Sequence, residues 1–195
     1  MKKVAITGGI ATGKSLILQK LMFMHYVVYS ADAIAHDVLR NEGKQDVINS
    51  FGSFILNEND EIDRKVLGKI VFNDLEKLTR LNIIIHPYVQ KRIKKIIEAN
   101  SHLDIIFFEV PLLFESHMED MFDASINVYT DIDMQIKRIM MRDDKTADDA
   151  LRIIRSQMTT FERNKRATYT INNSGTIEEM YEQLMIIVND ILSKE

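Results

Sequence analysis

The chain has 195 residues, of which 46% are hydrophobic, 28% charged and 8% aromatic, and it carries a formal net charge of −4. This length suits one α/β domain with an inserted segment and is short for two independent domains. The acidic balance argues against a non-specific binder of nucleic acid or acidic membranes, and the lack of cysteine excludes disulfides, thiolate nucleophiles and cysteine-ligated zinc. Because the start is too polar for a signal peptide and no apolar run approaches the ~18 residues of a membrane span, we expect a cytoplasmic protein.

Short runs of β-type residues alternate with helical patterns along the chain. Several of these runs are apolar on successive residues, which is typical of strands buried on both faces of a parallel sheet. We therefore predict an α/β fold in which a five-stranded parallel sheet is flanked by helices. The predicted strands are Lys3–Thr7, Val27–Ser30, Asp104–Val110, Ala124–Tyr129 and a weaker run at Thr168–Ile171.

The long stretch between the second and third strands contains helical patterns alone, and it is too long for one crossover helix. We interpret it as a helical insertion. Pro87 is expected to begin a helix, because its missing N–H costs nothing in a first turn. The helices predicted in this stretch are Ala31–Leu39, Gln45–Phe51, Arg64–Phe72, Leu75–Ile85 and Pro87–Ala99. Later helices are predicted at Ile132–Met141, from Thr146 to about Arg166, and at Ile177–Leu192, with capping signals at Thr146/Asp149 and Thr176/Glu179.

The segment TGGIATGKS, Thr7–Ser15, matches the phosphate-binding loop G-x-x-x-x-G-K-[ST] at every specified position. Its glycines let backbone N–H groups crowd around a phosphate, and the helix that follows adds its positive end. Lys14 would supply a charge to the phosphates, and Ser15 a hydroxyl ligand for Mg²⁺. The apolar strand before the segment and the helical pattern after it argue against a glycine-rich turn without a ligand. The predicted nucleotide-binding residues of the loop are Gly8, Gly9, Ile10, Ala11, Thr12, Gly13, Lys14 and Ser15.

Other residues narrow the chemistry that could follow nucleotide binding. Asn164-Lys165 is followed by Arg166-Ala167, so the guanine-reading N-K-x-D of GTPases is absent here, and a small P-loop chain with a helical insertion fits a nucleotide or metabolite kinase. Asp32 follows the second strand, where it could take a proton from an attacking hydroxyl or serve as an acid in the first turn of a helix. Glu109, at the end of the third strand, could hold Mg²⁺ through water or face solvent.

A family resemblance extends over nearly the whole chain. The motifs that carry it, in order, are TGGIATGKS, SAD, IDR, HP, VPLLFE, QIKRIMMRD, a Gln with E-x-x-x-x-A, and INNSG. Together they resemble the dephospho-coenzyme A kinase family, for which the P-loop alone is not specific but HP followed by PLLFE is. The resemblance implies ATP- and Mg²⁺-dependent phosphorylation of the ribose 3′-hydroxyl of dephospho-CoA, with a monophosphate-kinase-like core, a helical substrate domain and a mobile lid.

The resemblance also implies roles for single residues. It makes Asp32 the general base, and it places Lys14 and Ser15 on the phosphates and Mg²⁺. The acceptor would be bound by Arg64, His86, Pro87, Pro111, Leu112, Leu113 and Glu115. Arg138 and Arg142 would belong to the lid, and Asn173 and Gly175 would lie near the adenine of ATP. We place the core at about 1–30, 103–130 and 167–195, the acceptor-binding insertion at about 31–102 and the lid at about 131–166.

Simpler explanations exist for several of these residues. Arg64 could be a solvated residue at a helix start, and His86 could cap the helix begun by Pro87. Arg138 and Arg142 stand at i, i+4, where two arginines often meet solvent, although their mutual repulsion favours an anion between them. The chain also departs from the usual family pattern at Ala11, Leu16, Ser30 and Thr168. Of these departures, those at Leu16 and Thr168 bear on details of nucleotide contact and not on the reaction.

Two alternatives remain beside the leading interpretation. One is another small P-loop kinase, for a nucleoside or nucleoside monophosphate. The other is a non-catalytic nucleotide-binding module, which would need an incomplete set of catalytic residues. In each case we expect small-molecule partners, no nucleic acid, no membrane, and a monomer or weak homo-oligomer.

Overall fold

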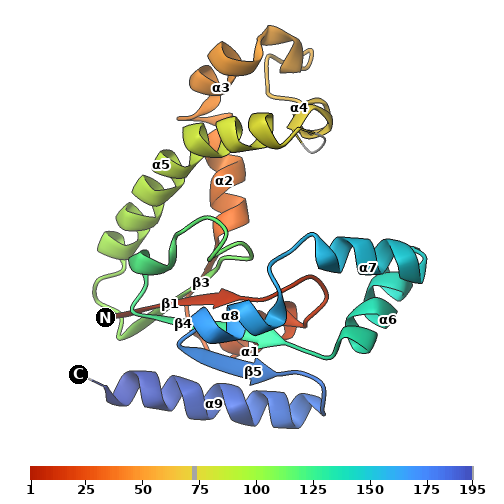
Figure 1. The fold of residues 1–195 in the computed structure, drawn as a ribbon. Helices are drawn as coiled ribbons and strands as arrows, with labels where there is room; N and C mark the ends of the chain where they lie inside the picture. Colours follow the sequence, from red (N-terminus) through yellow and green to blue (C-terminus); the bar gives the residue numbers. More distant parts are fainter. Residues whose placement is uncertain (72–73, 195) are drawn as a thin grey trace. The chain divides into compact units, whose positions relative to one another are not determined.

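The computed structural model describes residues 1–71 and 74–194. The chain divides into two compact units, which are described separately: Met1–Ser30 with Asn100–Glu195, the sheet unit, and Ala31–Ala99, the helical unit (Figure 1). No helix among the described residues is both long enough and apolar enough to cross a membrane.

The sheet unit is built on five parallel strands, as the sequence predicted. Their order is β2-β3-β1-β4-β5, so the first strand lies in the centre and its neighbours come much later in the chain. In such a sheet, ligands bind beyond the carboxyl ends of the strands where the strand order reverses, and here that point is the end of β1. The strands are β1 (Lys2–Thr7), β2 (Val28–Ser30), β3 (Ile105–Glu109), β4 (Ala124–Tyr129) and β5 (Tyr169–Asn172).

One face of the sheet is covered by the helices α1 (Lys14–Phe23) and α9 (Ile177–Ser193) (Figure 1). Alternate strand residues such as Val4 and Ile6 are fully buried against apolar side chains of these helices. The predicted cap of α9 is confirmed, because Thr176 and Glu179 form a reciprocal capping box. The sheet core therefore fixes both the strand that precedes the glycine-rich loop and the helix that follows it.

The helix predicted from Thr146 to Arg166 is two helices, α7 (Ala147–Arg155) and α8 (Thr160–Arg166). Thr146 caps the first, as expected, by accepting a hydrogen bond from the backbone N–H of Asp149. A second capping box, formed by Thr159 and Glu162, starts α8. That local signal competes with continuation of the helix, so the prediction of one long helix was wrong. α6 (Ile132–Asp143) precedes both.

The helical unit contains α2 (Ala31–Arg40), α3 (Lys44–Phe51), α4 (Arg64–Val71) and α5 (Leu75–Ala99). Arg92 of α5 forms ion pairs with Asp37 of α2 at 3.0 Å and with Glu42 of the α2–α3 connection at 2.5 Å. Helices occupy the predicted positions of this stretch with boundary shifts, but the predicted Leu75–Ile85 and Pro87–Ala99 helices are one helix, α5. The end of the predicted Arg64–Phe72 helix lies outside the described residues.

Pro87 does not begin a helix, contrary to prediction. It lies inside α5, which runs without interruption from Leu75 to Ala99. The residues Ile85, Val89 and Ile93 are buried at four-residue spacing on both sides of the proline. Burial of that continuous apolar stripe outweighs the backbone hydrogen bond that the proline cannot donate.

We expect Pro87→Ala to raise the free energy of unfolding by about 1–2 kcal/mol, since alanine restores a helical hydrogen bond while proline stiffens the unfolded chain somewhat more. Urea unfolding should show a higher midpoint with an unchanged slope. Lys91→Ala, an exposed substitution in the same helix, is the control and should change little. A less stable Pro87→Ala protein would mean that the ring itself makes stabilising contacts.

Candidate active site

The glycine-rich loop between β1 and α1 adopts a conformation that its glycines make possible. Gly13 has φ +97°, and a Cβ there would collide with the side-chain amide of Asn173. A Cβ on Gly8 would collide with the backbone carbonyl of Val128. Ala11 also has a positive φ, +56°, which costs an L-residue ~1–2 kcal/mol. This is one of the positions at which the chain departs from the pattern of the family that it resembles.

Three consecutive carbonyls of the loop are held by side chains from distant parts of the sheet unit. Each accepts a hydrogen bond from a different donor. Because the C=O and the following N–H of a trans peptide point in opposite directions, the next three N–H groups are turned to the other side of the loop. Such a row of N–H groups forms an anion-binding concavity. The pairs are Ile10 with Gln135 Nε2 at 2.7 Å, Ala11 with Arg138 Nη1 at 3.3 Å and Thr12 with Asn173 Nδ2 at 2.8 Å.

The preceding part of the loop is held from within. Lys14 Nζ donates to the carbonyl oxygens of Gly8 at 2.7 Å and Gly9 at 3.0 Å, and the Thr12 hydroxyl also donates to Gly9 O. The ammonium group therefore lies against the same loop whose N–H groups would surround a phosphate. This placement fits the predicted role of Lys14 beside an anion.

The predicted metal ligands lie on two elements of the sheet unit. Ser15 is in the first turn of α1, and Glu109 ends β3, in register with Ile6 of β1. No group of three or more His, Cys, Asp or Glu side chains suited to a metal occurs in the described part of the chain. Mg²⁺ at a nucleotide site takes only one or two protein oxygens beside phosphate and water, so a hydroxyl and a carboxylate suit this metal.

The two predicted lid arginines differ in their surroundings. Arg138 of α6 bonds the loop carbonyl of Ala11 and, at 3.3 Å, the carbonyl of Asn173. Arg142, one turn later, is exposed and makes a two-pronged ion pair with its neighbour Asp143 at 2.8 Å. That hydrogen-bonded pair raises the pKa of the Arg142 guanidinium. Arg138 therefore supports the loop, whereas Arg142 presents its charge at the surface.

Asn173 and Gly175, predicted near the adenine, have visible local functions. Asn173 is buried and its amide supports the loop, as described above. A Cβ on Gly175 would collide with the Glu179 carboxylate that caps α9, so a glycine leaves room for that cap.

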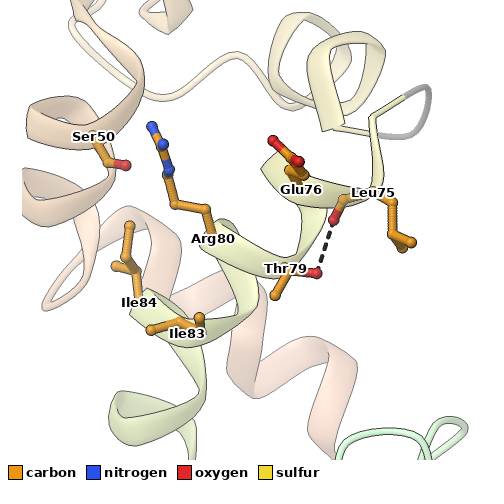
Figure 2. Close-up of a pocket in the computed structure, with 7 residues that line it drawn as sticks. All are labelled: Ser50, Leu75, Glu76, Thr79, Arg80, Ile83 and Ile84. Carbon is orange, nitrogen blue, oxygen red and sulfur yellow. Dashed lines mark hydrogen bonds between the residues drawn. The ribbon is translucent and has the colours of Figure 1, made fainter.

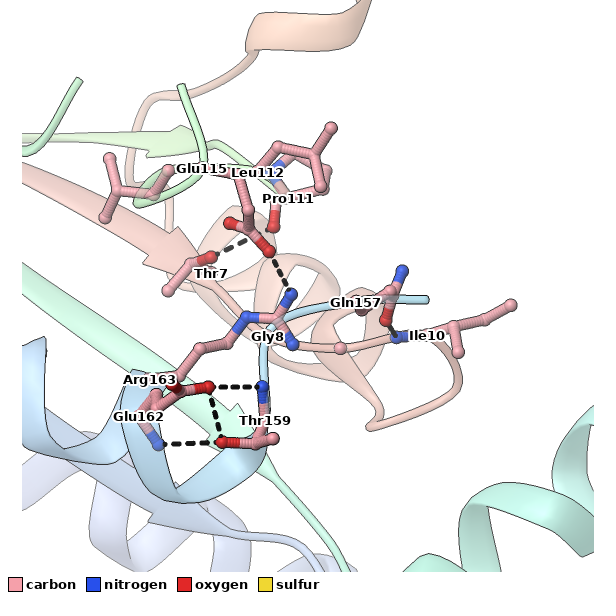
Figure 3. A network of polar contacts seen from close by, with 12 residues as sticks. Thr7, Gly8, Ile10, Pro111, Leu112, Glu115, Gln157, Thr159, Glu162 and Arg163 are labelled. Carbon is pink, nitrogen blue, oxygen red and sulfur yellow. Dashed lines mark hydrogen bonds and ion pairs between the residues drawn. The ribbon is translucent and has the colours of Figure 1, made fainter. Parts of the chain in front are cut away.

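The segment Pro111–Glu115 follows β3 at the same edge of the sheet. The Thr7 hydroxyl donates to Pro111 O at 3.2 Å, and Glu115 Oε1 pairs with Arg163 Nη2 at 2.6 Å (Figure 3). Leu112 is exposed whereas Leu113 is fully buried. Of the two leucines, Leu112 is therefore the one with surface available to a ligand.

Three polar residues near the loop were not assigned a role from the sequence: Gln135, Gln157 and Arg163. Gln135 and Arg163 are buried, with 4% and 2% of their surface exposed. Among the described residues, Arg163 Nε has no hydrogen-bond partner. The sequence held a partial signal, because Gln135 begins the motif QIKRIMMRD and Gln157 belongs to another of the family motifs. The burial of an arginine within an otherwise polar helix such as TFERNKR could not be read from its pattern.

In the helical unit, Asp32 lies exposed in the first turn of α2, and Arg64 begins α4. Their charges act on one imidazole, that of His36. Burial and the like charge of Arg64 lower the pKa of His36, and Asp32 opposes them. The two residues predicted to bind the acceptor thus lie within electrostatic reach of the same side chain.

His86 and Pro87 lie together in the interior of α5, with His86 partly buried and Pro87 exposed. His86 therefore does not cap a helix. A separate open pocket of about 660 Å³ in this unit lies between α3 and α5 (Figure 2). Its wall does not include Arg64, His86 or Pro87; it consists of Ser50, Leu75, Glu76, Thr79, Arg80, Ile83 and Ile84.

A parallel sheet with a phosphate-binding loop after its central strand defines the class of P-loop nucleotide-binding proteins, and comparison with known proteins gives the family. A family model described as dephospho-CoA kinase matches residues 2–179. The chain belongs to the dephospho-CoA kinase family. It is 43% identical to a dephospho-CoA kinase of Carboxydothermus hydrogenoformans, covering 95% of this chain and 92% of that one. Identity to the enzyme of Fusobacterium nucleatum is 40%, with 93% and 94% covered.

Solved structures agree with this assignment. The structure of dephospho-CoA kinase from Campylobacter jejuni is 28% identical and superposes with a TM-score of 0.73, covering 97% of this chain and 96% of that one. A Thermus thermophilus protein, also 28% identical, reaches a TM-score of 0.81 with 97% of both chains covered.

We expect Arg138→Ala to weaken nucleotide affinity about ten-fold as well as to slow turnover, because two backbone carbonyls lose a charged donor. Arg142→Ala should slow turnover and leave nucleotide affinity nearly unchanged. Titration calorimetry with ADP·Mg²⁺ and steady-state kinetics measure the two effects. Arg152→Ala, which removes an arginine of α7 that is 77% exposed, is the control. Equal nucleotide affinities for all three variants would mean that the Arg138 side chain does not support nucleotide binding.

The partly buried His86 gives a pH-dependent prediction. Burial lowers the pKa of His86 below its ordinary value of 6.5. As the pH falls through 6.5, the unfolded chain binds a proton that the folded chain resists, so the stability of the wild-type protein should decrease. Thermal melting between pH 7.5 and 5.5 should show a smaller loss in His86→Gln than in the wild type. An identical loss would place the titrating group elsewhere.

Proposed function

We propose that this protein transfers the γ-phosphoryl group of ATP to the ribose 3′-hydroxyl of dephospho-CoA, giving coenzyme A and ADP. Membership of the dephospho-CoA kinase family supports the reaction class. The observation that carries the proposal is the loop itself, whose three outward carbonyls turn successive N–H groups toward one side. A loop fixed in this way binds a polyphosphate without having to reorganise first.

On the phosphate side, the proposal gives each residue a defined task. Bound ATP·Mg²⁺ supplies the transferred group and partly neutralises its charge. The loop N–H groups and Lys14 hold the phosphates, and Ser15 with Glu109 provides the oxygen ligands for Mg²⁺. Arg142, whose charge lies at the surface of α6, would approach the transferred phosphoryl group when a lid formed by about residues 131–166 closes. Asn173 and Gly175 would border the adenine.

On the acceptor side, we propose that Asp32 orients the ribose hydroxyl and takes its proton. Ser30 ends β2, in register with Glu109 of β3, and Asp32 follows two residues later in the chain. Asp32 therefore follows the carboxyl end of β2, and ligands of such sheets bind beyond the carboxyl ends of the strands.

The helical unit would bind the rest of the acceptor. Arg64 would meet its diphosphate through a charge-assisted contact, while His86 and Pro87 would form part of the surface on α5. In the sheet unit, Pro111, Leu112, Leu113 and Glu115 are also proposed to serve acceptor binding. Leu113 would do so by supporting its neighbours, because its side chain is fully buried. We propose that the enzyme acts in the cytoplasm as a monomer or weak homo-oligomer.

Product identification tests the proposal directly. Each mixture contains the protein, ATP·Mg²⁺ and one acceptor, which is dephospho-CoA, AMP, GMP or uridine. The products are identified by mass spectrometry. We expect coenzyme A and ADP from the first mixture alone. Preferred phosphorylation of a nucleoside or nucleoside monophosphate would support the alternative small P-loop kinase, and no turnover with any acceptor would support a binding module.

We expect Asp32→Asn to lower turnover by ~10²-fold or more, in the range typical of general bases, with nucleotide affinity nearly unchanged. The substitution keeps the shape of the side chain but removes its charge. Coupled assays and calorimetry measure the two effects. Glu178→Gln, which removes an exposed acid from the first turn of α9, is the matched control and should change stability only. If Asp32→Asn behaves like this control, Asp32 is a helix-start acid and not the base.

A further inference from the structure

The backbone of Ile10, at the tip of the loop, is bonded on both sides by glutamine side chains from different elements. Its N–H donates to Gln157 Oε1 at 2.8 Å, and its carbonyl accepts from Gln135 Nε2 at 2.7 Å. Gln135 lies in α6, and Gln157 lies between α7 and α8. Figure 3 shows the contact between Ile10 and Gln157.

These two bonds fix two consecutive peptides in opposite senses. In the Gly9–Ile10 peptide, the N–H points outward to Gln157, while the carbonyl points inward to Lys14 and Thr12. In the next peptide the carbonyl points outward to Gln135, and the N–H of Ala11 therefore points inward. If this second peptide turned over, a carbonyl oxygen would face the phosphates in place of an N–H.

The partner groups determine which end of each amide makes the contact. A backbone N–H needs an acceptor, so Gln157 must present its oxygen, and a carbonyl needs a donor, so Gln135 must present its nitrogen. The two glutamines therefore do different jobs despite their identical side chains. One recognises a donor and the other an acceptor.

Packing leaves the glutamines little freedom. An added Cβ on Gly9 would lie 3.1 Å from Arg163 Nη1, 3.2 Å from Gln135 Nε2 and 3.4 Å from Gln157 Oε1, so three side chains close upon this glycine. Arg163 is in turn fixed by Glu115. The same three side chains line part of a pocket of about 510 Å³, and other residues of α6, α7 and α8 line it too.

We propose that Gln135 and Gln157 are positioning residues, which set the polarity of the two peptides at Ile10 so that the Ala11 N–H faces the nucleotide phosphates. They act through the backbone and do not touch the substrate themselves. Through them, α6 and the α7–α8 connection control the geometry of the loop. The proposal rests on the proposed function only in taking the loop as the site of nucleotide phosphates.

Donor and acceptor roles can be separated by substitution. Gln→Met at either position removes the hydrogen bond and keeps the length of the side chain. Gln→Glu keeps an acceptor but not a donor, so Gln157→Glu should preserve the contact with the Ile10 N–H, whereas Gln135→Glu should set a carboxylate against the Ile10 carbonyl. The measurements are affinity for ADP·Mg²⁺ by calorimetry, and kcat with KM for ATP and for dephospho-CoA.

We expect both Gln→Met variants and Gln135→Glu to bind ADP·Mg²⁺ about ten-fold more weakly, the usual effect of one buried group losing its partner. Gln157→Glu should stay within about three-fold of the wild type. KM for ATP should rise in the weakened variants, and KM for dephospho-CoA should not. Gln45→Met, at an exposed glutamine of α3 that bonds Asn49 within its own helix, is the control.

Equal effects of Glu at both positions would overturn the proposal, and so would variants that melt at lower temperature but bind the nucleotide normally. The affinity measurement needs no acceptor, so the outcome does not depend on the reaction. If the wild type binds ADP·Mg²⁺ but does not phosphorylate dephospho-CoA, the proposed function fails while the positioning roles are still judged by the four variants.

Discussion

The site depends on one constraint, which is that the carbonyl groups of Ile10, Ala11 and Thr12 must point away from the space that an anion would occupy. The glycines on either side of these residues do not impose this by themselves, because glycine permits more than one backbone conformation. The donors that impose it come from α6 and from the end of β5, more than a hundred residues later in the chain. The loop motif is local, but its functional shape is a tertiary property.

The sheet explains how such distant donors reach the loop. β1 is central, with β4 on one side and β5 beyond it, so the segments that follow these two strands emerge at the carboxyl edge beside the loop. α6 begins three residues after β4 ends, and Asn173 directly follows β5. The order of the strands by itself thus places the segments that carry Gln135, Arg138 and Asn173 near the loop.

The division between what could and could not be predicted follows the range of the interactions. The strands, the loop and the caps at Thr146 and Thr176 are encoded within a few neighbouring residues, and the structure has them where the sequence predicted them. Pro87 was misjudged because local preference favours a helix start, whereas the buried stripe on both sides of it continues the helix. The roles of Gln135, Gln157 and Arg163 depend on partners far along the chain, for which a single sequence gives no pattern.

The chemical nature of the donors around the loop also has a physical explanation. Two of the three side chains that donate to the outward loop carbonyls, Gln135 and Asn173, are neutral amides. The third is the guanidinium of Arg138, and the loop carries a cation of its own in Lys14. An arginine in place of Gln135 could bond the same carbonyl, but it would add a positive charge close to Lys14 and compete for the phosphates with the loop N–H groups. A neutral amide supplies direction without charge. The loop can therefore be held rigidly in the absence of nucleotide while its positive potential stays concentrated where an anion would bind.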